Sequence, residues 1–598
     1  METVIKLSDG SSVRARRYIP IGKNDFVRFD NNGELEVFVK NDQTFIPSTP
    51  WRLEKEFKIA GRNIDITFKE IETNEELEKY EGLKRFHYRG GGGAGRVVPL
   101  IARSDLWDLP EVLGFIEITS SMIANTARRD FFNAPYQEPG GLAWTTWNRG
   151  ASIKYSNIIA RISRVVVHPE IRGLGLSKLF LAAALNYTAL RWHYGGYRAR
   201  FLEITAEMLR YYPFVSGEDF VFAGNTEGNE HRLDKDMKYL VRKALSPEGI
   251  MPQGGGGVMT MQRGYAEKVL QFMKKSGTPL AAILDNLRHD PGVLDQVTWE
   301  ALYRVSRRPK PTYVAGLNAV ARTYVRNRAA LQAKPGVRTK LPESPRVWRI
   351  SKLRAEAYAD ISQSSNARAL QDTFGFVGKR LSTKVSSDFS IDLRSGEITL
   401  ICGASGSGKS LFLSAIYSIC RDSGASDDLR SASTTEGLEL LYSGQVDGSP
   451  LIQNLAEIDR KRTAISYLGK TSLKEFLDVN ASAGLAEPQL FVRPIASLSV
   501  GQAYRLQLAL SFLTVPNILI VDNFCETLDR YNVLAVCRGL QRLAKRYNVA
   551  VVVASAAYER LLAVLSPNQV VLLRRGDEPK LLDQSSNDEI TRLSQGLY

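Results

Sequence analysis

Two apolar segments, each leading through a glycine-rich turn into a helix, dominate the hydrophobic pattern of this chain. In the C-terminal half, residues 398–401 are apolar, residues 403–408 are rich in glycine, and a helical apolar pattern begins at Leu411. In the N-terminal half, residues 164–167 read as a strand that turns and enters a helix over residues 178–190. A glycine turn before a helix directs several backbone N–H groups toward one point. Both segments therefore predict a phosphate-binding loop.

The C-terminal loop reads G-A-S-G-S-G-K-S over residues 403–410 and fits G-x-x-x-x-G-K-[S/T] at every position. In this motif the lysine reaches the β- and γ-phosphates, and the last hydroxyl ligates Mg²⁺. We therefore expect ATP and Mg²⁺ as ligands. The expected nucleotide-binding residues of this loop are Gly403, Ser405, Gly406, Gly408, Lys409 and Ser410.

Two later segments extend the nucleotide motif. Residues 498–502 read L-S-V-G-Q, and an apolar strand over residues 518–521 ends at Asp522. An acidic residue at the end of a buried strand is placed to hold the Mg²⁺ shell. The order and spacing of these parts resemble an ABC-type ATPase domain, with the signature L-S-G-G-Q and the Walker B aspartate. The resemblance implies an ATP-dependent homodimer in which Ser499, Gly501 and Gln502 of one copy meet the nucleotide of the other.

Two positions depart from that family. It usually carries a glutamate after the Walker B aspartate and a histidine after the next strand, whereas this chain has Asn523 and Ala556. An asparagine can orient a water molecule but cannot take its proton. We therefore predict an ATPase domain that binds ATP and hydrolyses it slowly. Glu526 is an alternative base, although its offset does not match a simple replacement.

The N-terminal loop carries a different chemistry. Residues 172–177 read R-G-L-G-L-S, which resembles the acyl-CoA pyrophosphate loop R/Q-x-x-G-x-G/A of the GNAT acetyltransferases. The resemblance implies binding of acetyl-CoA or a related acyl-CoA. The surrounding strands expected over residues 97–102, 112–119 and 201–205 agree with that fold. The expected acyl-CoA-binding residues are Arg172, Gly173, Gly175 and Ser177.

The combination resembles a prokaryotic family in which a predicted acetyltransferase is fused to an ABC ATPase. The wording of the N-terminal loop also resembles, locally, the phage Mom-type DNA-modifying proteins. GNAT domains usually transfer the acyl group directly to an amine, with a general base or a water chain taking the amine proton. The candidate bases are Glu117 and Glu203, and Tyr212 is the candidate acid for the leaving thiolate.

The net charge of +15 is concentrated in one region. Residues 261–355 hold 19 Lys or Arg and 6 Asp or Glu, with aromatic residues between them. This pattern predicts a nucleic-acid partner, DNA more than RNA, bound through phosphates. A solvated basic helical linker is the alternative. The expected nucleic-acid contacts are Arg307, Arg308, Arg322, Arg326 and Arg328.

Residues 127–155 are rich in aromatic residues and arginine. Such a stretch can stack a flipped base in an acceptor pocket, or it can fill a local core. The sequence leaves both interpretations open.

We therefore expect an α/β multidomain protein. Its expected parts are a small β-rich module (1–55), a GNAT-like acyltransferase domain with a mixed sheet (56–250), a glycine linker with a basic, mainly helical region (251–370) and a P-loop ABC-type ATPase domain (371–598). No apolar run is long enough for a membrane span, and the N-terminus lacks a signal-peptide pattern. Four cysteines without metal-like spacing indicate a cytoplasmic protein.

Three functions agree with these features. The first is an acyl-CoA-dependent N-acyltransferase that modifies a nucleic-acid base, with an ATPase domain that dimerises and clamps the substrate. The second is an ATP-regulated acetyltransferase for proteins or small molecules. The third is an ATP-gated nucleic-acid-binding protein whose transferase fold has decayed. The complete Arg172–Gly175 motif argues against the third, and the basic region favours the first.

Overall fold

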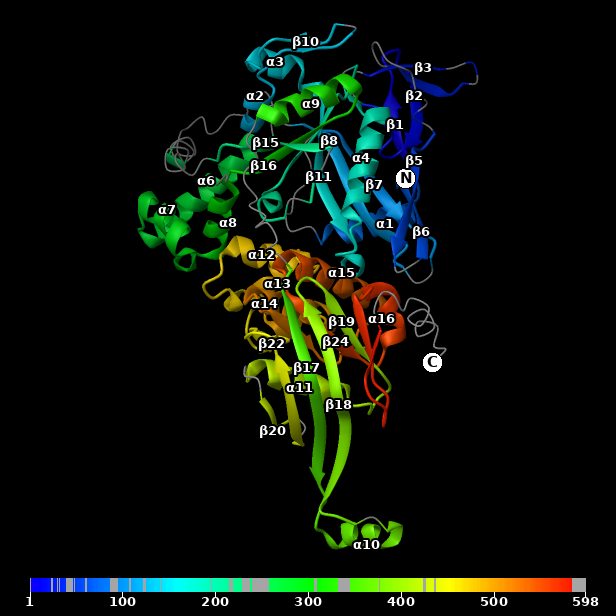
Figure 1. Ribbon diagram of the computed structural model, residues 1–598. Coiled ribbons are helices and arrows are strands. Elements are labelled where there is room, and N and C mark those ends of the chain that lie inside the picture. Colours follow the sequence, from blue (N-terminus) through cyan, green and yellow to red (C-terminus); the bar gives the residue numbers. More distant parts are fainter. Residues whose placement is uncertain are drawn as a thin grey trace.

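The computed structural model arranges the chain as two stacked domains, an N-terminal domain (residues 2–331) and a C-terminal domain (residues 346–582) (Figure 1). The described residues run from 2 to 582, except 23–24, 30, 32, 39–46, 48, 60–61, 87–94, 107–108, 122–124, 140, 195, 213, 216–218, 229–236, 239–256, 306–308, 332–344, 376, 423–425 and 435–436. Arg307 and Arg308, two expected nucleic-acid contacts, lie outside the described residues.

An eight-stranded mixed sheet forms the centre of the N-terminal domain. Apolar residues on its two faces pack against helices and loops, which explains why its central strands are almost continuously apolar. From one edge to the other, the strands are β15 (Phe220–Asn225), β16 (Pro311–Gly316), β14 (Phe201–Thr205), β11 (Ile159–Val167), β8 (Val112–Ser120), β7 (Val97–Arg103), β6 (Arg62–Glu70) and β5 (Arg52–Ile59).

The two central strands β11 and β14 part from each other along their length. They are parallel, whereas the other neighbouring strands described in this sheet are antiparallel. Their pairing ends where Ile162 lies opposite Ile204, although β11 continues to Val167 with β8 on its other edge. A bulge at Ser163 interrupts the pairing with β8, and bulges bend a strand. A gap therefore opens between β11 and β14.

β16 comes from the region that we expected to be mainly helical. It inserts between β14 and β15, so this expectation is wrong for Pro311–Gly316. The short run T-Y-V-A is rich in residues that favour strands, and the two neighbouring strands satisfy its backbone groups on both edges. The sequence pattern missed this strand because the partner that specifies it lies far away in the chain.

The helices of the N-terminal domain cover the sheet and its edges (Figure 1). α4 packs its buried face, including Phe180 and Ala184, on β8 and β11. The helix bounds are α1 (Asn74–Lys84), α2 (Thr126–Phe131), α3 (Arg149–Lys154), α4 (Ser177–Arg191), α6 (Gly257–Ser276), α7 (Leu280–His289), α8 (Gln296–Val305) and α9 (Ala319–Leu331). Short hairpins complete the domain: β1 (Glu2–Lys6) with β2 (Ser12–Arg16), β3 (Phe26–Phe29) with β4 (Leu35–Phe38), β9 (Tyr136–Gln137) with β10 (Ala143–Trp144), and β12 (His193–Tyr194) with β13 (Tyr197–Arg198).

The aromatic residues of the stretch 127–155, for which the sequence left a base-binding pocket and a local core as alternatives, form a buried core. Phe131 and Phe132 are fully buried, and Trp144 is 6% exposed. Their rings pack on one another and on Phe201 of β14 and Tyr324 of α9. Closed packing of this kind leaves no face free for a nucleobase, so the acceptor-pocket interpretation of this stretch is wrong.

The C-terminal domain combines two sheets (Figure 1). Its parallel core, closed by one antiparallel edge strand, is ordered β22 (Ile452–Asn454), β23 (Ile518–Val521), β24 (Ala550–Ser555), β19 (Ile398–Cys402), β25 (Gln569–Leu572) and β26 (Lys580–Leu582). An antiparallel sheet contains β18 (Arg380–Arg394), β17 (Val347–Asp360), β21 (Glu439–Val446) and β20 (Ser426–Ser433). The helices are α10 (Ser365–Phe374), α11 (Lys409–Arg421), α12 (Leu473–Ser482), α13 (Pro488–Phe491), α14 (Val500–Leu513), α15 (Arg530–Tyr547) and α16 (Tyr558–Leu565).

Two expected boundaries fall inside elements. The boundary at residue 55 cuts β5, which pairs with β6 as the edge of the large sheet. The boundary at residue 370 cuts α10, which joins β17 to β18 at the tip of a long arm (Figure 1). β5 pairs into the large sheet of the N-terminal domain, and β17 pairs into the antiparallel sheet of the C-terminal domain. Composition reveals neither pairing.

The aromatic core gives a direct test of the fold. We expect Phe132→Ala to lower the free energy of unfolding of the N-terminal domain by about 3–5 kcal/mol, because it leaves a cavity among packed rings. Phe374→Ala is the control, since Phe374 is 73% exposed on α10 and should change stability by less than about 0.5 kcal/mol. Urea denaturation followed by tryptophan fluorescence measures both. Equal stabilities of the two variants would contradict the assignment of this cluster to the core.

Candidate functional site

The C-terminal glycine loop lies between β19 and the N-terminus of α11. Lys409 is 8% exposed, and its Nζ donates to the carbonyls of Gly403 and Ala404 at 2.9 Å each. The buried Ser407 hydroxyl has no hydrogen-bond partner among the described residues. A lysine, an unsatisfied hydroxyl and a helix N-terminus fit the oxygens of a phosphate. A cavity of about 290 Å³ opens beside the loop, and its lining includes Gly403, Ser405, Gly406, Tyr558 and Arg574.

The L-S-V-G-Q segment begins α14. Ser499 caps the helix by accepting from the Gln502 N–H at 3.2 Å, and the Gln502 side chain accepts from the Ser499 N–H at 3.0 Å. Gly501 is buried, and a Cβ there would lie 2.3 Å from the Asn532 side chain, so only glycine fits. Val500 replaces a family glycine without a clash, because it is 57% exposed. The segment is thus an exposed helix N-terminus, suited to contact an anion on another molecule.

The strand β23 presents Asp522 at the carboxyl edge of the parallel sheet, the edge at which the glycine loop and Ser410 also lie. Asp522 accepts a hydrogen bond from the Asn523 N–H at 2.9 Å. A carboxylate and a hydroxyl at this edge suit Mg²⁺, which keeps several of its waters. Among the described residues, no group of three or more His, Cys, Asp or Glu side chains is placed to hold a metal ion.

The end of β24 carries the second departure from the family pattern. Glu526 Oε1 accepts from the Ala556 N–H at 2.6 Å and from the Ser555 hydroxyl at 3.4 Å. The carboxylate is therefore held by the loop after β24, where Ala556 has no side chain that could reach a phosphate. Asn523 has φ +50°, a left-handed conformation that asparagine tolerates.

Comparisons with known proteins match this half of the chain. A family model described as ABC transporter matches residues 386–526. The C-terminal domain is an ABC-type ATPase domain. The mouse mitochondrial "ATP-binding cassette sub-family B member 10" is 25% identical over 37% of this chain and 31% of that protein. The Bacillus subtilis "Uncharacterized ABC transporter ATP-binding protein YcbN" is 27% identical over 29% of this chain and 56% of that protein.

Among solved structures, a dimeric bacterial ABC transporter cassette is 16% identical and covers 40% of this chain and 98% of its own, with a TM-score of 0.28. The matches to curated proteins span less than two thirds of the length of the two relatives named above. Every described helix of this chain is too short or too polar to span a lipid bilayer.

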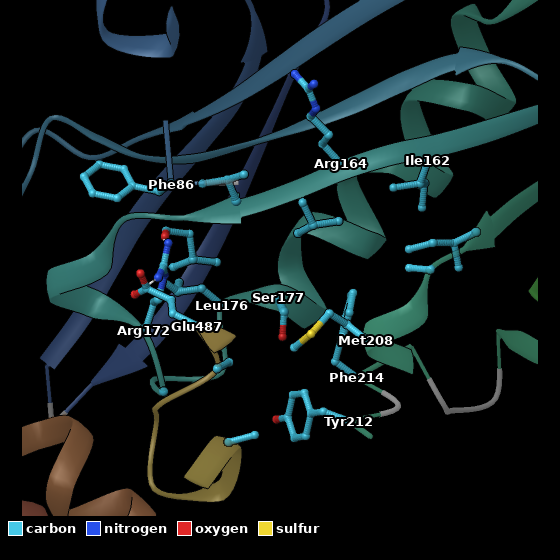
Figure 2. A pocket seen from close by; sticks show the side chains of 18 of the residues that line it. Phe86, Ile162, Arg164, Arg172, Leu176, Ser177, Met208, Tyr212, Phe214 and Glu487 are labelled. Atoms are coloured by element: carbon cyan, nitrogen blue, oxygen red, sulfur yellow. Dashed lines mark hydrogen bonds and ion pairs between the residues drawn. The ribbon is translucent and has the colours of Figure 1, made fainter. Parts of the chain in front are cut away.

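A second cavity of about 290 Å³ lies where β11 and β14 part, against the ATPase domain. The N-terminal glycine loop and the start of α4 form part of its wall, and the edge of β11 over residues 163–167 forms another part. Figure 2 shows Ser177, Met208, Tyr212 and Phe214 around this space, with Arg172 and Glu487 at one end. The structure thus brings together Arg172, Gly173, Gly175, Ser177 and Tyr212, five of the residues predicted from the sequence.

Gly173 and Gly175 give the loop its shape. Their φ angles are +88° and +94°, which side-chain-bearing residues rarely adopt. The loop ends at Ser177, the first residue of α4, so its N–H groups gather at a helix N-terminus. A Cβ on Gly175 would meet no atom within 4 Å, so the loop is open at this point.

Arg172 is held by both domains. Its Nε donates to the Val167 carbonyl at 2.9 Å, and its guanidinium forms an ion pair with Glu487 of the ATPase domain. Burial, and to a smaller extent the charge of Arg505, lower the pKa of Arg172 to about 10. Arg172 therefore remains charged at neutral pH and is paired with a carboxylate in the place where we expected a ligand's pyrophosphate.

The two candidate bases are not on this cavity. Glu117 is 1% exposed, accepts from the Tyr80 hydroxyl at 2.7 Å and pairs with Arg164, which points away from Arg172 and Tyr212 in Figure 2. Glu203 is also 1% exposed and is paired with the buried Arg128. Carboxylates enclosed in ion pairs away from the cavity cannot reach an acceptor proton. The structure therefore speaks against both residues as bases, and Tyr212 alone of the three catalytic candidates lines the cavity.

The expected nucleic-acid contacts on α9 divide into two kinds. Arg322 and Arg326 are exposed. Arg328 donates from Nε to the Phe131 carbonyl and from Nη2 to the Asp130 carbonyl, at 2.8 Å each. Arg328 thereby closes the C-terminal end of α2, and a structural role replaces the predicted phosphate contact.

Several cavity residues escaped the sequence prediction. Lys310 precedes β16, and Arg542, Glu487 and Gln489 come from the ATPase domain. They belong to no motif, and nothing in their local sequence marks them. Only the stacking of the two domains brings them to the N-terminal glycine loop.

Proposed function

We propose that this protein is an acyl-CoA-dependent N-acyltransferase acting on a nucleic acid, whose ATPase domain binds ATP, dimerises and clamps the substrate. The observation that carries the proposal is the cavity at the parting of β11 and β14, with a glycine loop and a helix N-terminus in its wall. The parting and the cavity support the resemblance of this domain to the GNAT acetyltransferases.

Two features of the cavity support the binding of an acyl-CoA. Backbone N–H groups of residues 173–177 at the start of α4 face a pyrophosphate. Residues 164–167 of β11 pair with β8 on one edge only, and none of the described strands pairs with the other edge. This edge can hydrogen-bond the amides of a pantetheine arm as an added strand would. A β11 N–H is then placed to polarise the thioester carbonyl.

Positioning supplies much of the rate in such a transfer. The acceptor amine attacks the thioester carbonyl carbon, the C–N bond forms and the C–S bond breaks. The Tyr212 hydroxyl gives its proton to the leaving thiolate, a water chain takes the proton of the amine, and Tyr212 regains a proton from water. A water chain is the fitting base because Glu117 and Glu203 are enclosed elsewhere.

The nucleic-acid part of the proposal rests on charge. Arg322 and Arg326 are exposed on α9, and Lys274 and Lys275 are exposed at the end of α6. The net charge of +15 favours association with phosphate backbones. A protein or a small-molecule amine is the alternative acceptor.

The ATPase domain is proposed to act as a slow switch. Lys409, Ser410 and Asp522 supply the ATP and Mg²⁺ site, and Ser499 to Gln502 supply the surface that meets the partner's nucleotide. Asn523 and Ala556 replace the usual base and the usual phosphate contact. Hydrolysis is therefore slow, and the ATP-bound homodimer stays closed. Closure of two copies around one nucleic acid keeps the acceptor near both transferase domains.

Acyl-CoA binding is testable at Gly175. We expect calorimetry on the full chain to show binding of acetyl-CoA that Gly175→Glu abolishes, because the carboxylate meets the pyrophosphate. Gly175→Ala is the matched control, since it carries the same strain at φ +94° without the charge, and should weaken binding by no more than about tenfold. Equal binding by wild type and Gly175→Glu would remove the acyl-CoA assignment.

The acceptor is testable by transfer of label. We expect full chain incubated with DNA, ATP-Mg²⁺ and acetyl-labelled acetyl-CoA to place label on nucleosides. The double change Arg322→Gln with Arg326→Gln should lower the slope of log affinity against log salt by about 1.8, because each phosphate contact contributes about 0.9.

The control for that experiment is the double change Arg368→Gln with Arg421→Gln, which removes the same charge from exposed positions of the ATPase domain. It should leave the slope unchanged. Label found on protein or on a small amine, and none on DNA or RNA, would replace the nucleic-acid acceptor by the alternative.

Slow hydrolysis is testable at Asn523. We expect wild-type turnover well below one per second, and we expect Asn523→Glu to raise it by about tenfold or more by restoring a general base. Asn523→Gln is the matched control, because it carries the same strain at φ +50° without a base. Light scattering in saturating ATP-Mg²⁺ should show a dimer. Wild-type turnover of tens per second would contradict the switch.

A further inference from the structure

Side chains of the ATPase domain donate hydrogen bonds directly to the N-terminal glycine loop. Arg542 Nη2 donates to the Gly173 carbonyl at 3.3 Å and to the Ser482 carbonyl at 2.8 Å. Arg538 donates to the carbonyl of Leu174. A Cβ on Gly173 would lie 3.2 Å from the Cα of Gly484, so the two backbones touch. The wall of the proposed acyl-CoA site is therefore shared by both domains.

Glu487 places a carboxylate in that wall, next to Arg172, where the pyrophosphate of the proposed ligand would bind. Its side chain is 15% exposed and pairs with Arg172, whose side chain is 13% exposed (Figure 2). Among the residues that line the cavity, Glu487 is the one described carboxylate. It pairs with Arg172 and shares the cavity lining with Lys310 and Arg542, and a pyrophosphate or a ribose phosphate would attract all three cationic groups.

A chain of contacts joins Glu487 to the signature segment. Arg505 of α14 is 4% exposed and donates to the carbonyls of Gly501 at 3.1 Å and Gly484 at 3.2 Å. It also donates to the Asn532 side chain at 2.9 Å, and Asn532 donates to Asp529. Gly484 therefore touches Gly173 on one side and the signature helix on the other. Arg505 thereby links the start of α14 to Gly484, which lies three residues before Glu487.

We propose that Glu487 is an internal competitor for the pyrophosphate of acyl-CoA and that ATP-driven engagement of the signature segment withdraws it from Arg172. This inference rests on the proposed acyl-CoA function of the cavity. Without ATP, the carboxylate neutralises Arg172 and places a negative charge where the phosphates bind. With ATP, the signature segment is drawn to the partner's nucleotide, and Arg505 and Gly484 carry Glu487 with it. By linkage, acyl-CoA then strengthens ATP-dependent dimerisation by the same factor.

The test is a set of calorimetric titrations of the full chain with CoA, with and without the non-hydrolysable analogue AMP-PNP and Mg²⁺. We expect Glu487→Gln to bind CoA at least about fivefold more tightly than wild type without nucleotide, because a partly buried like charge is removed from the phosphate site. AMP-PNP should tighten CoA binding by wild type by a similar factor. It should leave the affinity of Glu487→Gln nearly unchanged.

Glu457→Gln is the matched control, because it removes the same charge from an exposed position of the same domain outside the cavity. It should behave as wild type. AMP-PNP binding by each variant reports an intact ATPase domain. If glutamine at this position prevents folding, Glu487→Asp replaces it, since the shorter side chain draws the carboxylate back from Arg172 and the expected direction is the same.

The outcomes separate the two proposals. CoA binding by wild type that neither Glu487→Gln nor AMP-PNP changes overturns the competitor and leaves the acyl-CoA site standing. Loss of only one of the two effects also overturns it, because the mechanism requires both. No CoA binding by wild type and by Glu487→Gln, with or without AMP-PNP, overturns the acyl-CoA function itself.

Discussion

The parting of β11 and β14 is the constraint on which the N-terminal site depends. Two parallel strands that separate expose backbone groups, and buried backbone groups need partners. β14 remains paired with β16 on the edge that faces away from the gap, and β11 remains paired with β8 on its own outer edge. Unmet backbone groups are thereby confined to the edges that line the cavity. Only because this gap exists do the glycine loop, the start of α4 and Tyr212 line the same cavity.

The contact between the domains fixes the orientation of the glycine loop. Arg538 and Arg542 of α15 donate to carbonyls of the loop, so its peptide planes are held from the side of the ATPase domain. In a trans peptide the N–H points away from the carbonyl, so the next N–H groups are directed away from α15. Burial lowers the pKa of both arginines below the ordinary value, which is the cost of using charged side chains here.

The nucleotide half shows how much a local motif can predict. The loop before Lys409 and the segment from Ser499 to Gln502 lie as their sequences indicate, because short-range geometry between a strand and a helix N-terminus creates each of them. The sequence does not reveal the role of Glu526, since its partner Ala556 lies in the loop after β24, thirty residues along the chain. The Glu526 carboxylate holds the loop after β24, in which Ala556 stands in place of the usual histidine.

The sequence by itself determined the two glycine loops that precede helices, the ATPase domain and most strands around Arg172. These features depend on residues that are neighbours in the chain, so periodicity and glycine spacing report them. Tertiary structure decided the insertion of β16, the burial of Glu117, Glu203 and the aromatic stretch, and the anchoring of Arg328. It also decided that Glu487 faces Arg172. These outcomes depend on which distant surfaces meet, and the burial and pairing that follow leave no local pattern in the sequence.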